Sequence, residues 1–391
     1  MSIPSLVAIE GVIRHYAWGS RVAIARLLDI EPDGQPDAEL WFGAHAGDPA
    51  GVAEHGTTLD ALIAVDPVAA LGRSNGRRFG PQLPFLLKVL AAERPLSIQV
   101  HPSLEQAQAG FDAEEAAGVA RDAPERNYPD RNHKPELLCA LTPFEALCGF
   151  RPIAETLELL NALAVPQLGF VPDLLRGPGG LRAAFTALLS HAEPAVLVDA
   201  LTARIGARAQ VGPLHAAALA AQDFPGDIGV VLAVLLNYVR LEPGEAIFVA
   251  AGNVHAYLRG TGVEIMASSD NVLRCGLTPK YVDVAELLKI TDFSELAEPR
   301  CPAEVTGCVT RFPTPASDFE LEIIDLDPLT GSYGLADGVP HIVLCLEKAL
   351  ELEAAGTRVA LAPGHAAFVA AGSIGTTVHG GGRAFVASTP G

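Results

Sequence analysis

The chain has few basic residues and no long apolar run, and each shortage excludes a class of function. Its 391 residues carry 27 Lys and Arg against 46 Asp and Glu, a formal net charge of -19. Binding to nucleic acid or to an anionic membrane needs clustered positive charge, so we expect neither partner. The longest notable apolar run, Ile228–Leu236, is far shorter than the roughly 20 residues of a membrane-spanning helix.

Paired cysteines, an export signal and a nucleotide loop are also missing. The cysteines contain no C-x-x-C pair and no compact framework, so we expect reduced thiols; they are Cys139, Cys148, Cys275, Cys301, Cys308 and Cys345. Met1–Trp18 has no basic stretch followed by an apolar core. Gly177–Gly180 lacks the Lys and hydroxyl of a phosphate loop, which argues against a nucleotide. We therefore expect a cytoplasmic protein, and a monomer.

An internal repeat is present in the second half of the chain. Leu241–Gly252 and Leu361–Gly372 differ at only three of twelve positions. Each copy has Pro-Gly, alternating apolar residues and a closing Gly, which is typical of the turns and short strands of antiparallel barrels. The first copy is followed by His255 and the second by Gly375 at the same offset. We therefore predict two related barrels, of which only the first can offer a metal ligand there.

The length suggests two or three domains. Leu157, Leu160 and Leu163 stand at helical spacing between two prolines, and similar spacing recurs downstream. We predict a mainly β protein with a helical insertion: two jelly-roll (cupin-like) barrels plus an α-helical domain. Residues 1–150 and 241–300 would form the catalytic metal-binding barrel, 151–240 the helical insertion, and 301–391 a C-terminal barrel without a metal site.

Five segments carry most of the chemically informative residues. They are, in order, Glu39–His45, Leu83–Leu90, Ser97–Pro102, Tyr128–Glu136 and His255–Lys280. Together they resemble segments of the type I phosphomannose isomerases, also called mannose-6-phosphate isomerases, of the cupin superfamily. The resemblance extends from near the N-terminus to about residue 285 and becomes weaker after that.

The resemblance implies one zinc ion per chain, held by Gln99, His101, Glu136 and His255. Gln99 and His101 are two apart, so on a strand both side chains project from one face. Two nitrogens and two oxygens suit zinc, although manganese, cobalt or iron would also be tolerated. Two neutral imidazoles, an amide and one carboxylate leave a divalent ion with a net charge of about +1, so it stays a Lewis acid.

The resemblance also implies that Lys134, Glu264, Asp270 and Arg274 handle protons or charge, without selecting one base. Lys134 stands two residues before Glu136, so it would share the face of the metal site. Arg274 is the strongest candidate, because a guanidinium keeps its charge and can hold phosphate oxygens or a developing enediolate. The alternative for Arg274 is a structural ion pair with Asp270.

Three further residues are candidates for substrate binding. Lys88 follows the apolar run Leu83–Leu87, so its stem would be buried, and by resemblance its ammonium group would meet the phosphate. Ser97 offers a hydroxyl and Lys280 a second positive charge. The remaining histidines are expected at the surface or in satisfied core positions; they include His15, His45, His55, His191, His215, His341, His365 and His379.

The function implied by the resemblance is a metal-dependent isomerase of sugar phosphates. It would interconvert D-mannose 6-phosphate and D-fructose 6-phosphate through a cis-enediol, in carbohydrate metabolism that supplies GDP-mannose biosynthesis. Two alternatives stay open on the residues alone. One is a cupin dioxygenase that uses iron in the same barrel, and the other is a non-catalytic sugar-phosphate-binding regulator.

Overall fold

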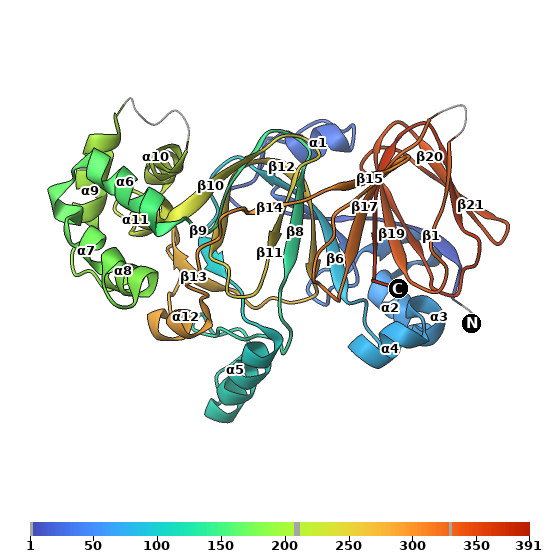
Figure 1. The fold of residues 1–391 in the computed structure, drawn as a ribbon. Helices are drawn as coiled ribbons and strands as arrows, with labels where there is room; N and C mark the ends of the chain where they lie inside the picture. Colours follow the sequence, from blue (N-terminus) through green and yellow to red (C-terminus); the bar gives the residue numbers. More distant parts are fainter. Residues whose placement is uncertain (1–2, 207–211, 328–330) are drawn as a thin grey trace.

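The computed structural model describes residues 3–206, 212–327 and 331–391. It consists mainly of antiparallel strands, with a cluster of helices at one end (Figure 1). The strands form two large sheets, one of eleven strands and one of seven, beside a four-stranded sheet and a short two-stranded one. The prediction of a mainly β protein with helices is confirmed. In the described residues the strand path of each large sheet has two ends, so neither sheet closes into a barrel.

The eleven-stranded sheet carries most of the segments singled out by sequence. Its strands are β2 (Val12–Arg14), β3 (Glu39–Gly43), β6 (Phe85–Ala92), β7 (Ile98–Val100), β8 (Glu136–Ala140), β9 (Phe144–Phe150), β10 (Leu236–Leu241), β11 (Ala246–Val249), β12 (His255–Ala267), β13 (Leu273–Gly276) and β14 (Arg300–Cys301). The long strand β12 pairs with β7 and β9 near its start and with β6 and β8 further on. It therefore links two groups of strands.

The other sheets come mostly from the C-terminal part of the chain. The seven-stranded sheet holds β1 (Leu6–Ile9), β15 (Glu304–Thr306), β16 (Val309–Arg311), β17 (Glu320–Asp325), β19 (His341–Glu347), β22 (Ala366–Val369) and β24 (Arg383–Ser388). The four-stranded sheet holds β18 (Ser332–Gly334), β20 (Leu350–Ala354), β21 (Thr357–Leu361) and β23 (Thr377–Gly380), and β4 (Gly51–Val52) pairs with β5 (Thr57–Thr58).

The internal repeat forms the same local structure twice. Gly244 and Gly364 have φ values of 91° and 79°, the conformation that glycine allows at the third position of a Pro-Gly type II turn. In each copy the residue after the glycine donates its N–H back across the turn, Glu245 to Glu242 and His365 to Ala362. The strands β11 and β22 follow, so the predicted turn and short strand are confirmed.

Helices predominate in residues 153–206 and 212–235, between strands β9 and β10. They are α6 (Ile153–Leu163), η2 (Pro166–Leu168), α7 (Phe170–Arg176), α8 (Gly180–Leu189), α9 (Pro194–Ile205), α10 (Pro213–Asp223), α11 (Gly229–Leu232) and η4 (Ala233–Leu235). Leu160 and Leu163 are buried on α6 while Leu157 is partly exposed, so the helical spacing seen in the sequence describes the packed face. Among the described residues no single helix could span a membrane; only the pair α8 and α9, bent by 109°, reaches the length and composition.

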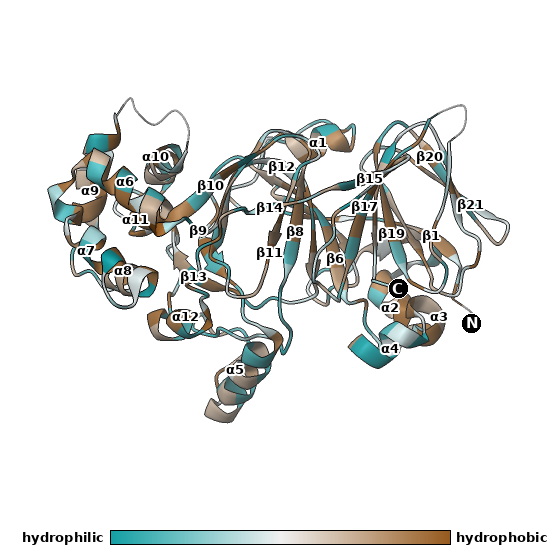
Figure 2. Ribbon diagram, viewed as in Figure 1, coloured by the Kyte–Doolittle hydropathy of each residue, from teal (hydrophilic) through white to brown (hydrophobic). Residues whose placement is uncertain are grey.

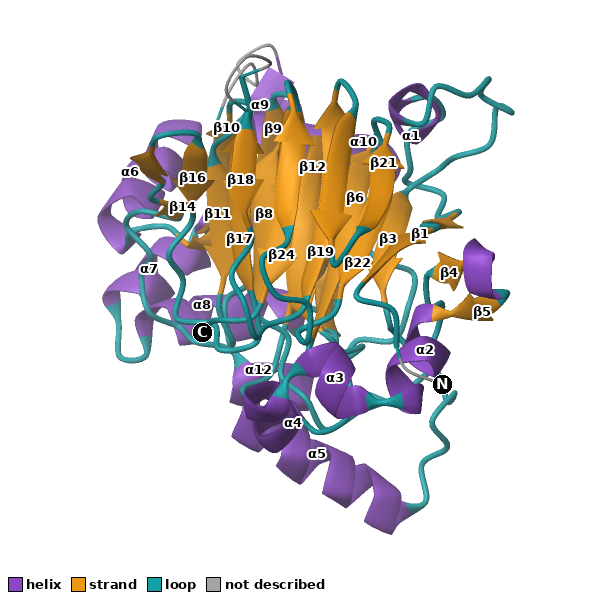
Figure 3. Cartoon of the chain, turned by 90° about the vertical axis from the view of Figure 1, so that its right-hand side faces the viewer, coloured by secondary structure: helices purple, strands orange, loops and turns teal. Residues whose placement is uncertain are grey.

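The remaining helices flank the sheets. They are α1 (Ala23–Leu27), η1 (Ala53–His55), α2 (Leu59–Val65), α3 (Pro67–Leu71), α4 (Arg73–Phe79), α5 (Leu104–Ala117) and α12 (Val284–Ile290). Figure 3 shows α3, α4, α5 and α12 beyond one end of the strands. Helix α5 begins with a capping box, in which Ser103 and Gln106 bond each other's backbone N–H.

One apolar core joins the two large sheets. Phe42, Leu87 and Ile265 of the eleven-stranded sheet belong to the same buried cluster as Phe368 and Phe385 of the seven-stranded sheet. Figure 2 shows apolar residues along strands of both sheets, such as β6 and β19. The N-terminal strand β1 also pairs with β22, across most of the sequence. The C-terminal part therefore packs on the N-terminal part through core residues of both.

Truncation after residue 300 should yield an insoluble or molten fragment. The cut removes β22, the pairing partner of β1, and exposes the face around Phe42 and Leu87. Each large side chain returned to water costs roughly 1.5–3 kcal/mol, so several exceed the stability of an ordinary domain. Solubility and the near-ultraviolet circular dichroism of fragment 1–300 would be compared with those of the full chain. A soluble, active fragment would show that this interface is dispensable.

Candidate metal centre and active site

A cavity of about 640 Å³ is lined by polar side chains from two rows of strand residues. In one row Trp41, Lys88 and Glu264 are register partners on the adjacent strands β3, β6 and β12. In the other row Arg274, Gln99 and His255 are partners on β13, β7 and β12. Because register partners project from the same face of a sheet, each row presents its side chains together. The cavity is therefore built largely by strand pairing.

The cavity contains nearly all the residues singled out by sequence. Its lining includes Lys88, Ser97, Gln99, Lys134, Glu136, His255, Glu264, Asp270, Arg274 and Lys280. His101 is absent from the lining because it is fully buried, with 0% of its surface exposed. It nevertheless contacts Glu136.

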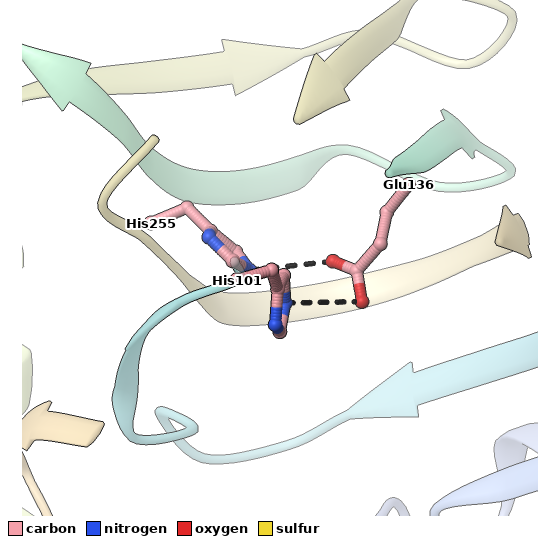
Figure 4. A group of neighbouring side chains, drawn as sticks. All are labelled: His101, Glu136 and His255. Carbon is pink, nitrogen blue, oxygen red and sulfur yellow. Dashed lines mark ion pairs between the residues drawn. The ribbon is translucent and has the colours of Figure 1, made fainter. Parts of the chain in front are cut away.

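His101, Glu136 and His255 converge on one point (Figure 4). His101 directly follows β7, while Glu136 opens β8 and His255 opens β12. The Nε2 atom of His101 lies 3.3 Å from Oε1 of Glu136, and that of His255 lies 3.3 Å from Oε2. Two ligand atoms at roughly 2.1 Å from a tetrahedral ion lie about 3.4 Å apart. The spacing therefore fits ligands of one such ion.

The tautomers of the His101 and His255 rings are those expected of ligands of a cation. Nδ1–H of His101 donates to the Asn271 carbonyl at 2.9 Å, and Nδ1–H of His255 donates to the Asn253 carbonyl at 3.1 Å. In the neutral form of each ring, Nε2 then carries a lone pair that faces the carboxylate, and Nε2 of His101 has no hydrogen-bond partner in the described residues. Burial lowers the pKa of His101 to about 4 in spite of Glu136. Buried acceptors that meet without a proton need a positive ion between them.

Lys134 lies next to this group. Its Nζ atom is 3.2 Å from Oε1 of Glu136, so it shares the face of the metal site as its spacing predicted. Burial alone would raise the pKa of Glu136, but the charge of Lys134 opposes it, and that pKa lies well below the usual range. The adjacent His133 contacts Asp318 at 2.9 Å instead. The Lys134 ammonium is thus a fixed neighbour of the metal group.

Gln99 is placed to complete the ligand set. It pairs with His255 on β12 and with Arg274 on β13. Its Nε2–H donates to Oγ of Ser97 at 3.2 Å, which leaves the amide oxygen as the atom available to a cation. Its role as the fourth ligand stays a prediction.

A half-buried carboxylate, Asp130, connects the two polar segments Tyr128–Glu136 and His255–Lys280. It accepts a hydrogen bond from the Ser269 hydroxyl and another from the Asp270 N–H at 2.6 Å. The amide of Asn271 donates to the Asp130 carbonyl at 2.9 Å, and the Asn271 carbonyl in turn orients His101. The position of a candidate metal ligand therefore depends on a side chain that the metal does not touch.

Replacing Asp130 with alanine should weaken zinc binding by roughly 10- to 100-fold, the usual cost of losing an outer support of a ligand. The loop that carries Asn271 would lose its anchor, so the His101 ring would no longer be held in one orientation. Competition with a chromophoric chelator measures the affinity. Asp112→Ala is the matched control, because Asp112 is exposed and pairs only with Arg131 at the surface. Equal affinities of the two variants would exclude this support role.

Another part of the cavity wall holds a buried polar network. Lys88 donates to Oε2 of Glu264 at 3.0 Å and lies 3.7 Å from Oε1 of Glu39. Tyr257 donates to Oε1 of Glu264, and Trp41 Nε1–H donates to Oε2 of Glu39, both at 2.8 Å. Burial alone would lower the pKa of Lys88, but the Glu264 and Glu39 carboxylates outweigh it and raise it. The two carboxylates therefore favour the charged form of Lys88.

Arg274 and Lys280 form the basic part of the cavity. Within residues 3–206, 212–327 and 331–391, no carboxylate lies within ion-pair distance of Arg274, and burial lowers its pKa. The charge of Arg274, and then burial, lower the pKa of Lys280. Asp270 instead lies 3.5 Å from Nε2 of His45. The alternative of an Arg274–Asp270 ion pair is therefore wrong, and two neighbouring cations face the cavity.

Sequence reasoning missed Glu39, Trp41, His45 and Tyr257, which also line the cavity. His45 had been expected in a surface or satisfied core position, but it is 8% exposed in the cavity wall. A signal was available for Glu39, since it is a charged residue in an otherwise apolar strand. Nothing in the sequence indicated which cation or indole would pair with it.

Comparisons with known proteins agree over most of the chain. Residues 6–153 match the family model for the catalytic domain of type I phosphomannose isomerase. The chain is 39% identical over 385 residues to the mannose-6-phosphate isomerase of Escherichia coli, covering 95% of this chain and 96% of that protein. It is 36% identical over 334 residues to the human mannose-6-phosphate isomerase, covering 75% of this chain and 74% of that one.

Solved structures show the same similarity. A mutant of phosphomannose isomerase from Salmonella typhimurium superposes with a TM-score of 0.92 at 37% identity, covering 99% of this chain and 100% of the other. A zinc-bound mannose 6-phosphate isomerase superposes with a TM-score of 0.91 at 37% identity and the same coverage.

Proposed function

Because this chain belongs to the type I phosphomannose isomerase family, we propose roles for the cavity residues that the sequence singled out. The enzyme is a metal-dependent aldose–ketose isomerase that interconverts D-mannose 6-phosphate and D-fructose 6-phosphate through a cis-enediol. It uses one zinc ion per chain. The observation that carries this function is the convergence of two imidazole lone pairs on the buried Glu136 carboxylate.

His101, Glu136 and His255 would hold the zinc ion, with the Gln99 amide oxygen as fourth ligand. Zinc, when bound, supplies a Lewis acid that polarises a carbonyl or hydroxyl oxygen of the sugar. The two backbone carbonyls that accept from Nδ1–H fix the orientation of both imidazoles and leave Nε2 of each ring as the atom available to a metal ion. The protein thus prepares the ligands before metal arrives.

Isomerisation requires a proton to leave C2 and another to reach C1. Lys134 lies nearest to the metal group, 3.2 Å from Glu136, so we assign it the proton exchange closest to the reacting carbons. Asp270 faces the cavity with its side chain 59% exposed, and it would serve the sugar hydroxyls. Burial raises the pKa of Glu264 while Lys88 opposes the rise. Glu264 would hold Lys88 and Tyr257 in place.

The phosphate group would bind at the basic part of the cavity. Arg274 has no carboxylate partner in the described residues, and Lys280 is close enough for its pKa to respond to that charge. Ser97 adds a hydroxyl beside Gln99. Lys88 already has two carboxylate neighbours, so we assign it to a sugar oxygen rather than to the phosphate. The phosphate would therefore bind Arg274 and Lys280 rather than Lys88, because Lys88 already has carboxylate counter-ions.

The enediol route is tested by running the reaction in deuterated water. Fructose 6-phosphate formed from mannose 6-phosphate should acquire deuterium at C1, because a proton held by a side chain exchanges with solvent. Nuclear magnetic resonance of the product measures the label. Product without any label after many turnovers would contradict an enediol and favour direct hydrogen transfer between the two carbons.

The two alternative functions gain no support from the relatives, which are mannose-6-phosphate isomerases in bacteria and mammals. A dioxygenase would consume oxygen, and a regulator would bind the sugar phosphate without turnover. An oxygen electrode trace alongside the isomerase assay distinguishes all three. We expect no oxygen uptake during turnover.

We also propose the domain arrangement in its finer form. Residues 1–150 and 241–300 would make a catalytic jelly-roll barrel, 151–240 a helical insertion and 301–391 a second jelly roll without a metal site. The repeated turns before β11 and β22 support two related units, and Gly375 stands where the first copy has His255. Strand β1 is the exception within 1–150: it pairs with β22 in the C-terminal sheet, so it would belong to the second unit. Monomeric state and cytoplasmic location stay predictions.

A further inference from the structure

Glu39 belongs to the cavity wall but has no part in the roles assigned above. It is a carboxylate with 7% exposure on strand β3, in a stretch of five buried residues. Burying a charge is costly unless it is paired. The indole N–H of Trp41 binds its Oε2, and Nζ of Lys88 lies 3.7 Å from its Oε1. The Trp41 N–H therefore binds one carboxylate oxygen of Glu39, and the other oxygen faces the Lys88 ammonium.

Lys88 is held in three directions. Glu264 accepts from it at 3.0 Å, Glu39 lies on its second side at 3.7 Å, and the ring of Trp41 lies 5.3 Å from Nζ. An ammonium on a four-carbon stem otherwise rotates freely, which weakens any hydrogen bond it makes to a substrate. Two carboxylates for one cation also exceed what neutralising Lys88 requires. We therefore infer that Glu39, the more distant of the two carboxylates, does more than balance the charge of Lys88.

We propose that Glu39 is a positioning residue for the isomerase reaction: it holds the Lys88 ammonium against the cavity, where Lys88 stabilises the negative charge that develops on a sugar oxygen. Trp41 supports this arrangement by fixing the carboxylate through its N–H and by covering the ammonium with its ring. This inference rests on the proposed function and adds a residue that does not touch the metal group. A donor held in advance acts at the transition state without reorganising, so its loss appears mainly in kcat.

The variant Glu39→Gln keeps the shape and an acceptor for Trp41 but removes the charge that faces Lys88. We expect kcat for mannose 6-phosphate to fall roughly 10- to 100-fold, the worth of the charge-assisted hydrogen bond that Lys88 would make to the sugar oxygen, while KM changes much less. Zinc content should stay at one ion per chain. Asp37→Asn is the matched control, because Asp37 is a buried carboxylate on the same segment that pairs with His15 and does not line the cavity.

A double-mutant cycle with Lys88→Met separates positioning from a merely structural role. If Glu39 acts through Lys88, Glu39→Gln should cause no further loss of kcat in the Lys88→Met background. Lys88→Met leaves Glu39 and Glu264 as two buried carboxylates without their cation, so adding Glu39→Gln should raise the melting temperature of that variant. If the two substitutions acted independently, their fold-losses of kcat would multiply and their losses of stability would add.

A second route covers the case in which Lys88→Met does not fold. Trp41→Phe removes the N–H that fixes Glu39 and keeps a ring near Lys88, so its loss of kcat should not multiply with that of Glu39→Gln. The inference is overturned if Glu39→Gln retains kcat within about twofold of the wild type, since one lost charge-assisted contact costs more, or if the losses multiply. Lack of turnover by wild type and by Asp37→Asn would instead refute the proposed function itself.

Discussion

Replacing His255 with alanine should remove both the bound zinc and the turnover. His255 contributes one of the two imidazole lone pairs that face Glu136, and without it the ion would keep one buried imidazole, one carboxylate and at most the Gln99 amide. The loss of affinity should exceed the roughly 10- to 100-fold that outer supports cost. Zinc per chain by elemental analysis and activity in a coupled assay measure the two losses together.

His379→Ala is the control for that experiment. His379 lies on β23 of the four-stranded sheet and hydrogen-bonds Thr377, so its loss should change neither zinc content nor rate. A His255→Ala protein with full activity would refute the metal centre. If His255→Ala lost activity but still bound one zinc ion per chain, His255 would act in catalysis without being needed as a metal ligand.

Replacing Arg274 with methionine should lower kcat/KM by roughly 10²- to 10³-fold, the typical cost of removing a preorganised donor from an active site, with zinc content unchanged. Methionine keeps much of the side-chain volume but leaves the phosphate with only Lys280 and Ser97. Arg274 has no carboxylate partner in the described part of the chain, so no buried anion is left unpaired. Steady-state kinetics with mannose 6-phosphate measure the loss.

The same Arg274 variants separate phosphate binding from stabilisation of the enediolate. If Arg274 binds phosphate, Arg274→Met should erase the preference for mannose 6-phosphate over unphosphorylated mannose, and the slow reaction with mannose should be unaffected. Arg274→Lys should recover only part of the rate, because an ammonium cannot bind two phosphate oxygens in a fixed plane. If Arg274→Met kept kcat/KM within a few-fold of the wild type, Arg274 would have no role in binding the phosphate.

Local patterns predicted much of the fold. The repeated Pro-Gly turns, the short apolar strands β11 and β22 and the helical spacing of Leu157, Leu160 and Leu163 depend on neighbouring residues, and neighbours are visible in a sequence. The spacing of Gln99 and His101 also predicted side chains on one strand face, but His101 lies just beyond β7, so the joint role of the two side chains stays a prediction. The pairing of β1 with β22 joins residues that are hundreds of positions apart. Such pairings depend on packing that no local pattern encodes.

Within the site, too, the sequence predicted some groupings of residues but not the contacts that hold them in place. The resemblance brought His101, Glu136 and His255 together, and the structure places them around one point. It could not show that backbone carbonyls fix both imidazole tautomers, because backbone atoms carry no sequence signal. Nor could it show that Asp130 anchors the loop behind His101, or that Asp270 lies beside His45 instead of Arg274. These contacts are set by the three-dimensional arrangement of the strands.

The most direct measurement is a zinc titration of metal-free protein, with fructose 6-phosphate formation from mannose 6-phosphate followed at each addition. Chelation should abolish turnover, and activity should return in proportion to added zinc until one ion per chain is bound, with no further rise. Turnover that survives complete removal of metal, or protein that binds one zinc per chain and forms no fructose 6-phosphate, would contradict the account of this site.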